Sequence, residues 1–438
     1  MADRQMSWVM LASVGLMLFA LFFGAGNLIF PALLGQQAGM NWVAATVGFL
    51  LTGAGLPLLG VVAIGLSGER DVRALASRAH PVFGLLFAFA LYLTIGPLFA
   101  LPRTATVSFE VGVAPLLQEA HLRWALALFT LVFFAVSLWL ALSPNRLVDR
   151  IGKILTPSLL LCILVLVAFA WVSPMGALQQ GIEKYSQHAL MAGFVEGYNT
   201  MDALASLVFG VMVLEAIRQK TQHHAALRLT AYAGMIAVGV LALVYTAIAY
   251  LGASSVAGIG LLDNGAKVLA LSAQHYLGTV GNILLAVIVL LACLTTSVGL
   301  ITACASFFQS LMPQVSYKLW AVGLSVFSAV VANWGLSALI SFAIPVLMVL
   351  YPLTVVVILL TLLSPITGNG RAVYGVTILF TLPFALLDGY NAAVGLPASW
   401  MTWFGANWPL YTLNLGWLLP AVVGLVLGYL LSDKKRVH

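Results

Sequence analysis

The sequence predicts an all-α polytopic membrane protein with about 12 transmembrane helices. Of its 438 residues, 62% are hydrophobic and only 7% are charged, whereas a soluble domain has about 25% charged residues. The mean hydropathy of +1.07 is equally high. Apolar runs of about 18 residues or more recur along the chain, and runs of that length cross a bilayer as helices. A transmembrane barrel would instead show alternating segments of about ten residues.

The spans are defined by apolar runs that alternate with short charged loops. Together they form one transmembrane domain over residues 1–438, without a large soluble domain. The stretch 104–123 is semi-polar, and we expect it to lie partly outside the bilayer. The approximate limits of the spans are 7–33, 42–66, 81–103, 124–142, 154–172, 190–214, 229–252, 277–309, 319–333, 336–363, 373–389 and 409–431.

The distribution of lysine and arginine predicts the orientation. Most of them lie in one set of alternate loops and at the two termini, while the other set carries only Arg123, Lys184 and Lys267. Because basic loops stay on the cytoplasmic side, both termini are expected inside the cell. The net charge of +6 is spread over many short loops, so a nucleic-acid partner is not expected and the bilayer is the main surroundings.

The sequence lacks the motifs of most membrane enzymes. There is no GxxxxGK[ST] motif for ATP and no HExxH motif for zinc. The histidines fall in loops, at span ends or at the terminus, whereas a haem or copper protein needs histidine ligands at depth. A carrier or a channel is therefore favoured over an enzyme. A channel would need a continuous polar stripe, but polar residues here gather in isolated clusters.

The first span, LFALFFGAGNLIFPALLG, contains the first of these clusters. Gly24, Gly26 and Asn27 lie near its middle and Pro31 follows one turn later. Glycine and proline both weaken a helix, so the pattern predicts an unwound point. Unwound backbone is tolerated in a membrane only where it lines a cavity. Its free amides would attract an anion and its free carbonyls a cation. Alternatively, the glycines only allow close helix packing.

The sixth span, MAGFVEGYNTMDALASLVFG, contains the second cluster. Glu196 and Asp202 lie within an apolar run, where each carboxylate costs about 2.5 kcal/mol or more. The polar residues between them predict a second break. Alternatively, residues 181–199 form an external loop and the helix begins at Met201. Breaks in the first and sixth spans indicate inverted repeats with a substrate between the interrupted helices. The polar residues concerned are Gly197, Tyr198, Asn199 and Thr200.

The eighth span, ACLTTSVGLITACASFF, carries three adjacent hydroxyls, those of Thr295, Thr296 and Ser297. A lone Ser or Thr in a helix usually bonds a carbonyl of its own helix. Three in a row cannot all face the same way, so some can face a cavity. Hydroxyl and carbonyl oxygens together suit a small hard cation such as sodium and disfavour a transition metal.

Several segments resemble the bacterial branched-chain amino acid carriers of the LIV-II type, which are cation symporters for leucine, isoleucine and valine. The resemblance covers essentially the whole chain, and EGYNTMDALAS is its most specific part. It implies a carrier in the bacterial cytoplasmic (inner) membrane that uses sodium as coupling ion and no organic cofactor. The matching segments are GAGNLIFP (24–31), LPRTATVSFE (101–110), EGYNTMDALASLVFG (196–210) and the Thr-Thr-Ser of the eighth span.

A wider similarity to leucine-transporter-like proteins implies a five-plus-five inverted repeat. The repeats would cover about 7–172 and 190–363, with two extra helices over 373–431. At the positions that match these proteins, five groups would bind one sodium. The sixth span departs from their pattern because it carries two carboxylates, so a second sodium site stays open. The five groups are the carbonyls of Ala20, Phe23 and Ala292 and the hydroxyls of Thr295 and Thr296.

The same resemblance implies a site for an aliphatic amino acid. Its carboxylate would meet the amides of residues 24–26, and its ammonium would meet free carbonyls with Glu196 or Asp202 nearby. Tyr92 and Phe194 are further candidates for an apolar pocket around the side chain. The expected substrate-binding residues are Phe22, Gly24, Ala25, Gly26, Asn27, Glu196, Gly197, Tyr198, Asn199 and Asp202.

Two further points stay open at this level. Arg103 would either pair with Glu110, or with an acid on another helix, to latch an outer gate, or snorkel to the membrane interface. The alternative function is a proton-coupled carrier or exchanger for another small amino acid or metabolite, in which protonation of Glu196 or Asp202 supplies the coupling. The oligomeric state is not predicted.

Overall fold

The computed structural model describes the chain except for residues 1–7, 143–159, 162, 219–222 and 433–438. Within this described part, all regular elements are helices. Among the described residues, seven helices are long and apolar enough to cross a membrane, or eight if one bent pair is counted as a single span. This confirms the all-α polytopic class. Three shorter apolar helices are Ile163–Val172, Tyr317–Ala332 and Leu418–Leu431.

The chain divides into two compact units. The first comprises Met1–Ala54, Leu93–Met201 and Tyr232–Ile340, and the second comprises the three segments between and after them. The first unit contains the helices α1 (Trp8–Phe22), α2 (Ala25–Ala38), α3 (Trp42–Leu50), α7 (Ala100–Gly112), α8 (Leu122–Ala141), α10 (Glu183–Glu196), α13 (Gly265–Leu311), α14 (Tyr317–Ala332) and most of α12 (His223–Ile259).

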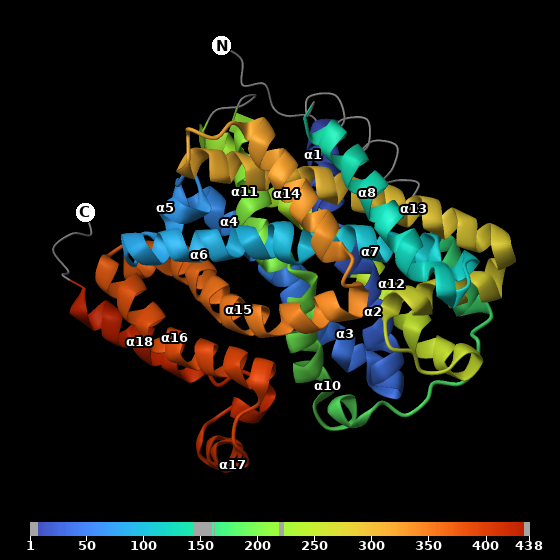
Figure 1. Cartoon of the computed structure of the whole chain (residues 1–438). Helices are drawn as coiled ribbons and strands as arrows, with labels where there is room; N and C mark the ends of the chain where they lie inside the picture. Colours follow the sequence, from blue (N-terminus) through green and yellow to red (C-terminus); the bar gives the residue numbers. More distant parts are fainter. Residues whose placement is uncertain (1–7, 143–159, 162, 219–222, 433–438) are drawn as a thin grey trace. The chain divides into compact units, whose positions relative to one another are not determined.

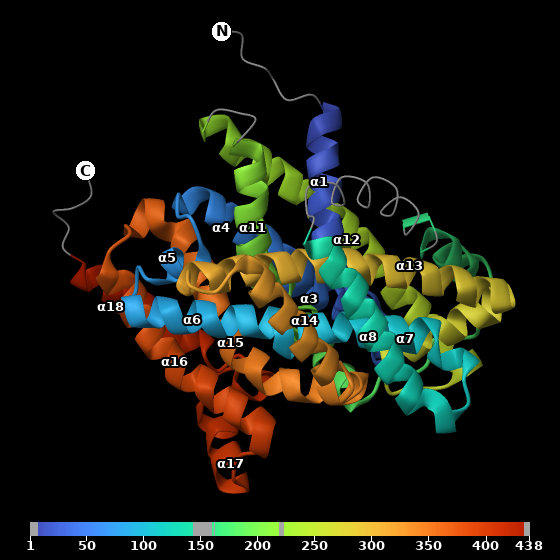
Figure 2. The same ribbon diagram turned by 45° about the horizontal axis from the view of Figure 1, so that its top comes forward.

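The long helix α13 organises the first unit. It runs beside α7 and also contacts α2, α8 and α14 (Figures 1 and 2). Gly278, with φ of 58°, interrupts α13 one residue after the start expected for the eighth span, and the apolar helix itself begins at Gly265. Helix α10 packs on α3 through Gly48 and Gly193, since a Cβ on either would overlap a main-chain carbonyl of the other helix. Small residues allow helices in membranes to approach this closely.

The third span is longer than its apolar run suggested. A π-helical turn, η3 (Thr94–Leu98), holds Gly96 in a non-helical conformation next to Pro97. After this kink α7 continues to Gly112, with most of its residues buried. The helix thus extends nine residues beyond the limit of 103 expected for this span, while the expectation that 104–123 lies partly outside the bilayer stays a prediction. Its Thr and Ser hydroxyls bond carbonyls one turn back in the same helix, which makes a semi-polar segment compatible with burial.

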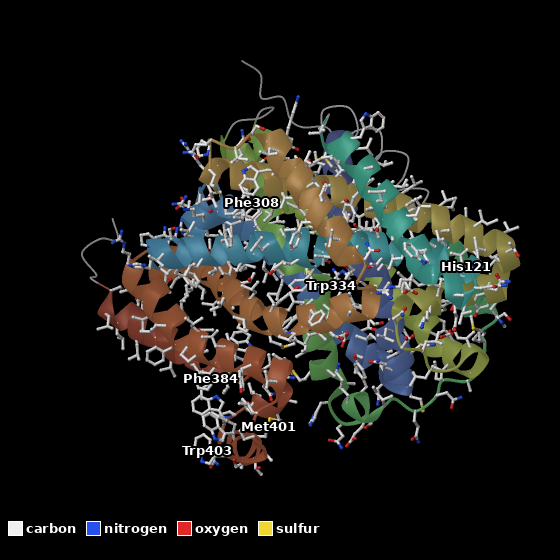
Figure 3. All side chains as sticks on the ribbon, viewed as in Figure 1. His121, Phe308, Trp334, Phe384, Met401 and Trp403 are labelled. Atoms are coloured by element: carbon white, nitrogen blue, oxygen red, sulfur yellow. The ribbon has the colours of Figure 1, made fainter. Side chains whose placement is uncertain are left out.

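In its described residues, the second unit contains eight helices in whole or in large part. In it α4 contacts α11 and α16 lies along α18 (Figure 1). Phe384 stacks on Trp408 with ring centroids 4.6 Å apart, and Trp403 packs edge-on against Phe404 near the end of the extra helices (Figure 3). The helices are α4 (Leu56–Ser67), α5 (Val72–Ala76), α6 (Pro81–Leu93), α11 (Asp202–Arg218), α15 (Leu336–Thr367), α16 (Arg371–Val394), α17 (Ala398–Asn407) and α18 (Leu418–Leu431).

Candidate functional site

The first span is broken where the sequence predicted it. Helix α1 ends at Phe22 and α2 begins at Ala25, with Gly24 in an extended conformation (φ −114°, ψ −162°). In an unbroken helix the Gly24 amide would donate to the carbonyl of Ala20. Here it donates to Oδ1 of Asn27 at 3.1 Å instead. The break therefore releases a carbonyl at the end of α1 and leaves Ala25 and Gly26 as the first helical residues of α2, whose amides have no partner further back in the helix.

Asn27 holds this break to the rest of the first unit. Its side chain is only 2% exposed, and its Nδ2 donates a hydrogen bond to the hydroxyl of Tyr245 on α12. The side-chain oxygen thus accepts a local hydrogen bond, whereas the side-chain nitrogen donates to a residue 218 positions away in the sequence. The sequence indicated Asn27 as a candidate residue of the break but not Tyr245, because no local sequence pattern indicates so distant a contact.

The expected sodium ligands gather beside the break. Thr296 donates to the carbonyl of Phe23 at 3.4 Å, and Thr295 donates to the carbonyl of Ala292 at 2.7 Å. A Cβ on Gly24 would lie 3.1 Å from Oγ1 of Thr296, so a side chain at this position would press on the cluster. The groups are all neutral oxygens, which suit a hard monovalent cation rather than a transition metal. Among the described residues, no three His, Cys, Asp or Glu side chains come together as a metal site.

The sixth span is also broken. Helix α10 ends at Glu196, a short 3-10 turn η7 covers Gly197–Thr200, and Met201 adopts a left-handed conformation (φ 65°) before α11 begins at Asp202. Because α10 is a helix, the alternative of a loop over 181–199 was wrong. A positive φ is uncommon for a side chain such as methionine and is found where the surroundings impose it, often at functional sites.

Glu196 is engaged by its neighbours. Its Oε2 lies 2.8 Å from Nζ of Lys184, and its Oε1 accepts a hydrogen bond from Nδ2 of Asn199 at 3.0 Å. The Lys184 side chain is 47% exposed, against 13% for Glu196. The carboxylate therefore ties η7 to the exposed end of α10.

The residues of η7 pack closely against their neighbours. Tyr198 is 1% exposed and its ring lies 5.9 Å from that of Phe194. A Cβ on Gly197 would overlap the hydroxyl of Thr52, so only glycine allows this approach. Phe22, at the end of α1, is also buried.

Arg103 is buried on α7. It is only 6% exposed, so it does not snorkel to the interface. Its Nη1 donates to the carbonyl of Asn199 at 2.6 Å and its Nη2 to that of Thr200 at 3.1 Å. Its Cζ lies 5.2 Å from the ring centre of Phe30 on α2. An ionisable residue inside a span is by default a functional candidate, and that signal was present in the sequence.

The first unit thus brings together most of the candidate residues. Helix α2 contacts η7, so the two breaks face each other. Asp202 and Tyr92 belong to the second unit, and their roles remain predictions. The candidates within the first unit are Ala20, Phe22, Phe23, Gly24, Ala25, Gly26, Asn27, Glu196, Gly197, Tyr198, Asn199, Ala292, Thr295 and Thr296.

Comparisons with known proteins agree with this architecture. The family model described as "Branched-chain amino acid transport protein" matches residues 8–435. The chain is 48% identical to the branched-chain amino acid permease BraB of Bacillus subtilis (strain 168), over 96% of this chain and 94% of the relative. It is 45% identical to the branched-chain amino acid transport system 2 carrier protein of Pseudomonas aeruginosa, over 95% and 94%.

Two solved structures share the fold at low sequence identity. MhsT in complex with L-phenylalanine has a TM-score of 0.56 at 15% identity, covering 98% of this chain and 99% of that chain. Mhp1, a nucleobase-cation-symport-1 family transporter in a closed conformation with bromovinylhydantoin bound, has a TM-score of 0.63 at 14% identity, covering 96% and 91%. Both have the leucine-transporter-like fold.

Proposed function

This chain belongs to the branched-chain amino acid transport protein family, and from that premise we propose that it is a secondary active symporter that imports leucine, isoleucine or valine together with sodium. The observation that carries the proposal is the meeting of two broken spans within one compact unit. In secondary transporters such breaks expose main-chain groups to substrate and ion.

The substrate carboxylate binds at the start of α2. The amides of Ala25 and Gly26 are the first of that helix, and its dipole is positive at this end. The Gly24 amide contributes less, because it already donates to Asn27. The ammonium meets carbonyls at the end of α1, where the dipole is negative.

The aliphatic side chain lies among buried aromatic rings. Phe22 and Tyr198 are both almost completely buried, and Phe194 packs against Tyr198. An apolar pocket distinguishes aliphatic side chains mainly by size, and one methylene is worth only about 1–3 kcal/mol. Leucine, isoleucine and valine therefore compete for one site.

Sodium binds at the cluster beside the first break. The carbonyls of Ala20, Phe23 and Ala292 and the hydroxyls of Thr295 and Thr296 supply five oxygen ligands. Two hydrogen bonds support this assignment. The Thr295 hydroxyl donates to the Ala292 carbonyl, and the Thr296 hydroxyl donates to the Phe23 carbonyl, so each hydroxyl lies beside one of the expected carbonyl ligands. Ion binding would turn the hydroxyl protons away and present oxygen lone pairs instead.

Sodium supplies the energy for uptake by alternating access. One charge moved through 100 mV releases about 2.3 kcal/mol, which supports about fifty-fold accumulation of a neutral amino acid. Such a carrier works across a bacterial cytoplasmic membrane, and the distribution of basic residues among the loops supports an orientation with both termini inside the cell.

Uptake of radiolabelled leucine into proteoliposomes tests this function. An inward sodium gradient should drive uptake above the level reached with potassium, and unlabelled isoleucine and valine should compete with it. Uptake that follows a proton gradient and ignores sodium would contradict the ion assignment and favour a proton-coupled carrier. Uptake of neither leucine, isoleucine nor valine under any gradient would contradict the substrate assignment.

A further inference from the structure

Arg103 places a permanent positive charge inside the first unit. It lies on α7 and is 6% exposed. An arginine remains protonated in proteins, and burying a charge is unfavourable unless polar groups replace the lost water. The polar groups that contact the guanidinium of Arg103 therefore indicate its role.

Two acceptors of the guanidinium are consecutive main-chain carbonyls. Asn199 and Thr200 end η7, directly before the left-handed Met201. Carbonyls at the end of a helix have no intrahelical donor and carry the negative end of its dipole. The guanidinium reaches both at 2.6 and 3.1 Å, and its two-pronged shape suits a pair of acceptors better than an ammonium does.

The guanidinium is also adjacent to the first break. Its Cζ lies over Phe30 of α2 at 5.2 Å from the ring centre. Its Nη2 would be 2.7 Å from a Cβ on Gly26, so it approaches the backbone at the start of α2 closely. One cation thus connects the breaks of the first and sixth spans.

We infer that the Arg103 guanidinium takes the place of a second coupling ion at the break of the sixth span, so that one free sodium per substrate is sufficient. Main-chain carbonyls at such a break attract a cation, and here the side chain of Arg103 supplies it. Unlike a free sodium ion, the guanidinium is covalently attached and does not dissociate during the transport cycle. The inference rests on the proposed function and specifies its stoichiometry.

The first test needs no substitution. Leucine binding to the purified full-length protein is measured over a range of sodium concentrations. A Hill coefficient of about 1 for sodium is expected, because the coefficient cannot exceed the number of coupled sites. A coefficient of about 2 would overturn the inference and leave the proposed function intact.

The second test removes the charge. Arg103→Gln should weaken leucine binding by about tenfold or more at fixed sodium, since bonds from charged donors are lost. Arg123→Gln, which alters an exposed arginine at the start of α8, is the control and should bind like the wild type. Arg103→Lys keeps the positive charge but lacks the planar pair of donors of the guanidinium, so its leucine affinity should lie between those of Arg103→Gln and the control.

Chemical rescue separates the charge from a merely structural role. Millimolar guanidinium chloride should restore part of the leucine binding of Arg103→Ala, whereas urea, a neutral molecule of similar shape, should not. Equal rescue by both, or wild-type affinity in Arg103→Gln, would overturn the inference. A wild-type protein that binds no leucine at any sodium concentration would instead overturn the proposed function, and this inference would fall with it.

Discussion

The hydroxyl of Thr296 donates a hydrogen bond to the carbonyl of Phe23 at 3.4 Å. This bond connects the centre of α13 to the break between α1 and α2, across 273 residues of sequence. The Phe23 carbonyl precedes the first turn of α2, so a group from another helix can reach it. A cation at this place would bind both segments at once, and its presence would therefore couple their positions.

Replacing both Thr295 and Thr296 by alanine should weaken sodium binding. Two hydroxyl ligands are lost, and we expect the sodium concentration for half-maximal leucine uptake to rise by about tenfold or more. The order of preference among leucine, isoleucine and valine should stay the same. The measurement is leucine uptake into proteoliposomes at varied sodium.

Thr302→Ala is the matched control. Its hydroxyl bonds the carbonyl of Val298 in its own helix at 2.8 Å, so sodium dependence should not change. If the double variant and this control responded alike, the sodium site would lie elsewhere.

Asn27 should contribute more to stability than its partner Tyr245. Asn27→Ala leaves the buried Gly24 amide without its acceptor, which costs about 1–3 kcal/mol. Asn27→Ala removes the bond to Tyr245 as well, whereas Tyr245→Phe removes only that one bond of the Asn27 side chain, so its cost should lie at the lower end of this range. Thermal unfolding in detergent should show this order, with the exposed Asn407→Ala unchanged. The reverse order would mean that Asn27 does not hold the break.

Gly26→Ala should abolish uptake. A Cβ there would lie 2.7 Å from Nη2 of Arg103 and 3.3 Å from the ring of Phe30, so the guanidinium must move away from the start of α2. Gly239→Ala in α12 is the control, because no atom lies within 4 Å of its added Cβ. Leucine uptake comparable to the wild type in Gly26→Ala would show that this contact has no part in transport.

Most of the fold followed from the sequence, because apolar length and breaks are local properties. The GAGN break between Phe22 and Ala25 is where glycine spacing predicted it, and the break of the sixth span lies at Met201 within its polar patch. The third span was misjudged, because the hydroxyls of α7 that lower its hydropathy bond carbonyls of their own helix. The boundaries of the inverted repeats remain predictions.

The site followed only in part, because its contacts join distant segments. Thr296 donates to the carbonyl of Phe23, so two of the expected sodium ligands lie next to each other, while the sodium site itself stays a prediction. The partner of Asn27 on α12 and the acceptors of Arg103 on η7 are set by tertiary packing, and no local pattern in the sequence indicates them. For Arg103, its buried position was the missing information.

Glu196 distinguishes sodium coupling from proton coupling. Glu196→Gln keeps an acceptor for Asn199 and loses the ion pair with the half-exposed Lys184, which is worth about 0–1 kcal/mol. We therefore expect leucine uptake to change only a few-fold and to remain sodium-dependent. Glu183→Gln, an exposed change on the same helix, is the control. Complete loss of gradient-driven uptake with exchange retained would instead assign the coupling to this carboxylate.

Equilibrium binding of leucine to the purified protein in sodium and in potassium tests the central claim most directly, namely that the two facing breaks form one site for amino acid and ion. The account predicts saturable leucine binding that strengthens as sodium rises and that isoleucine and valine displace. Leucine binding of equal strength in sodium and in potassium would contradict it.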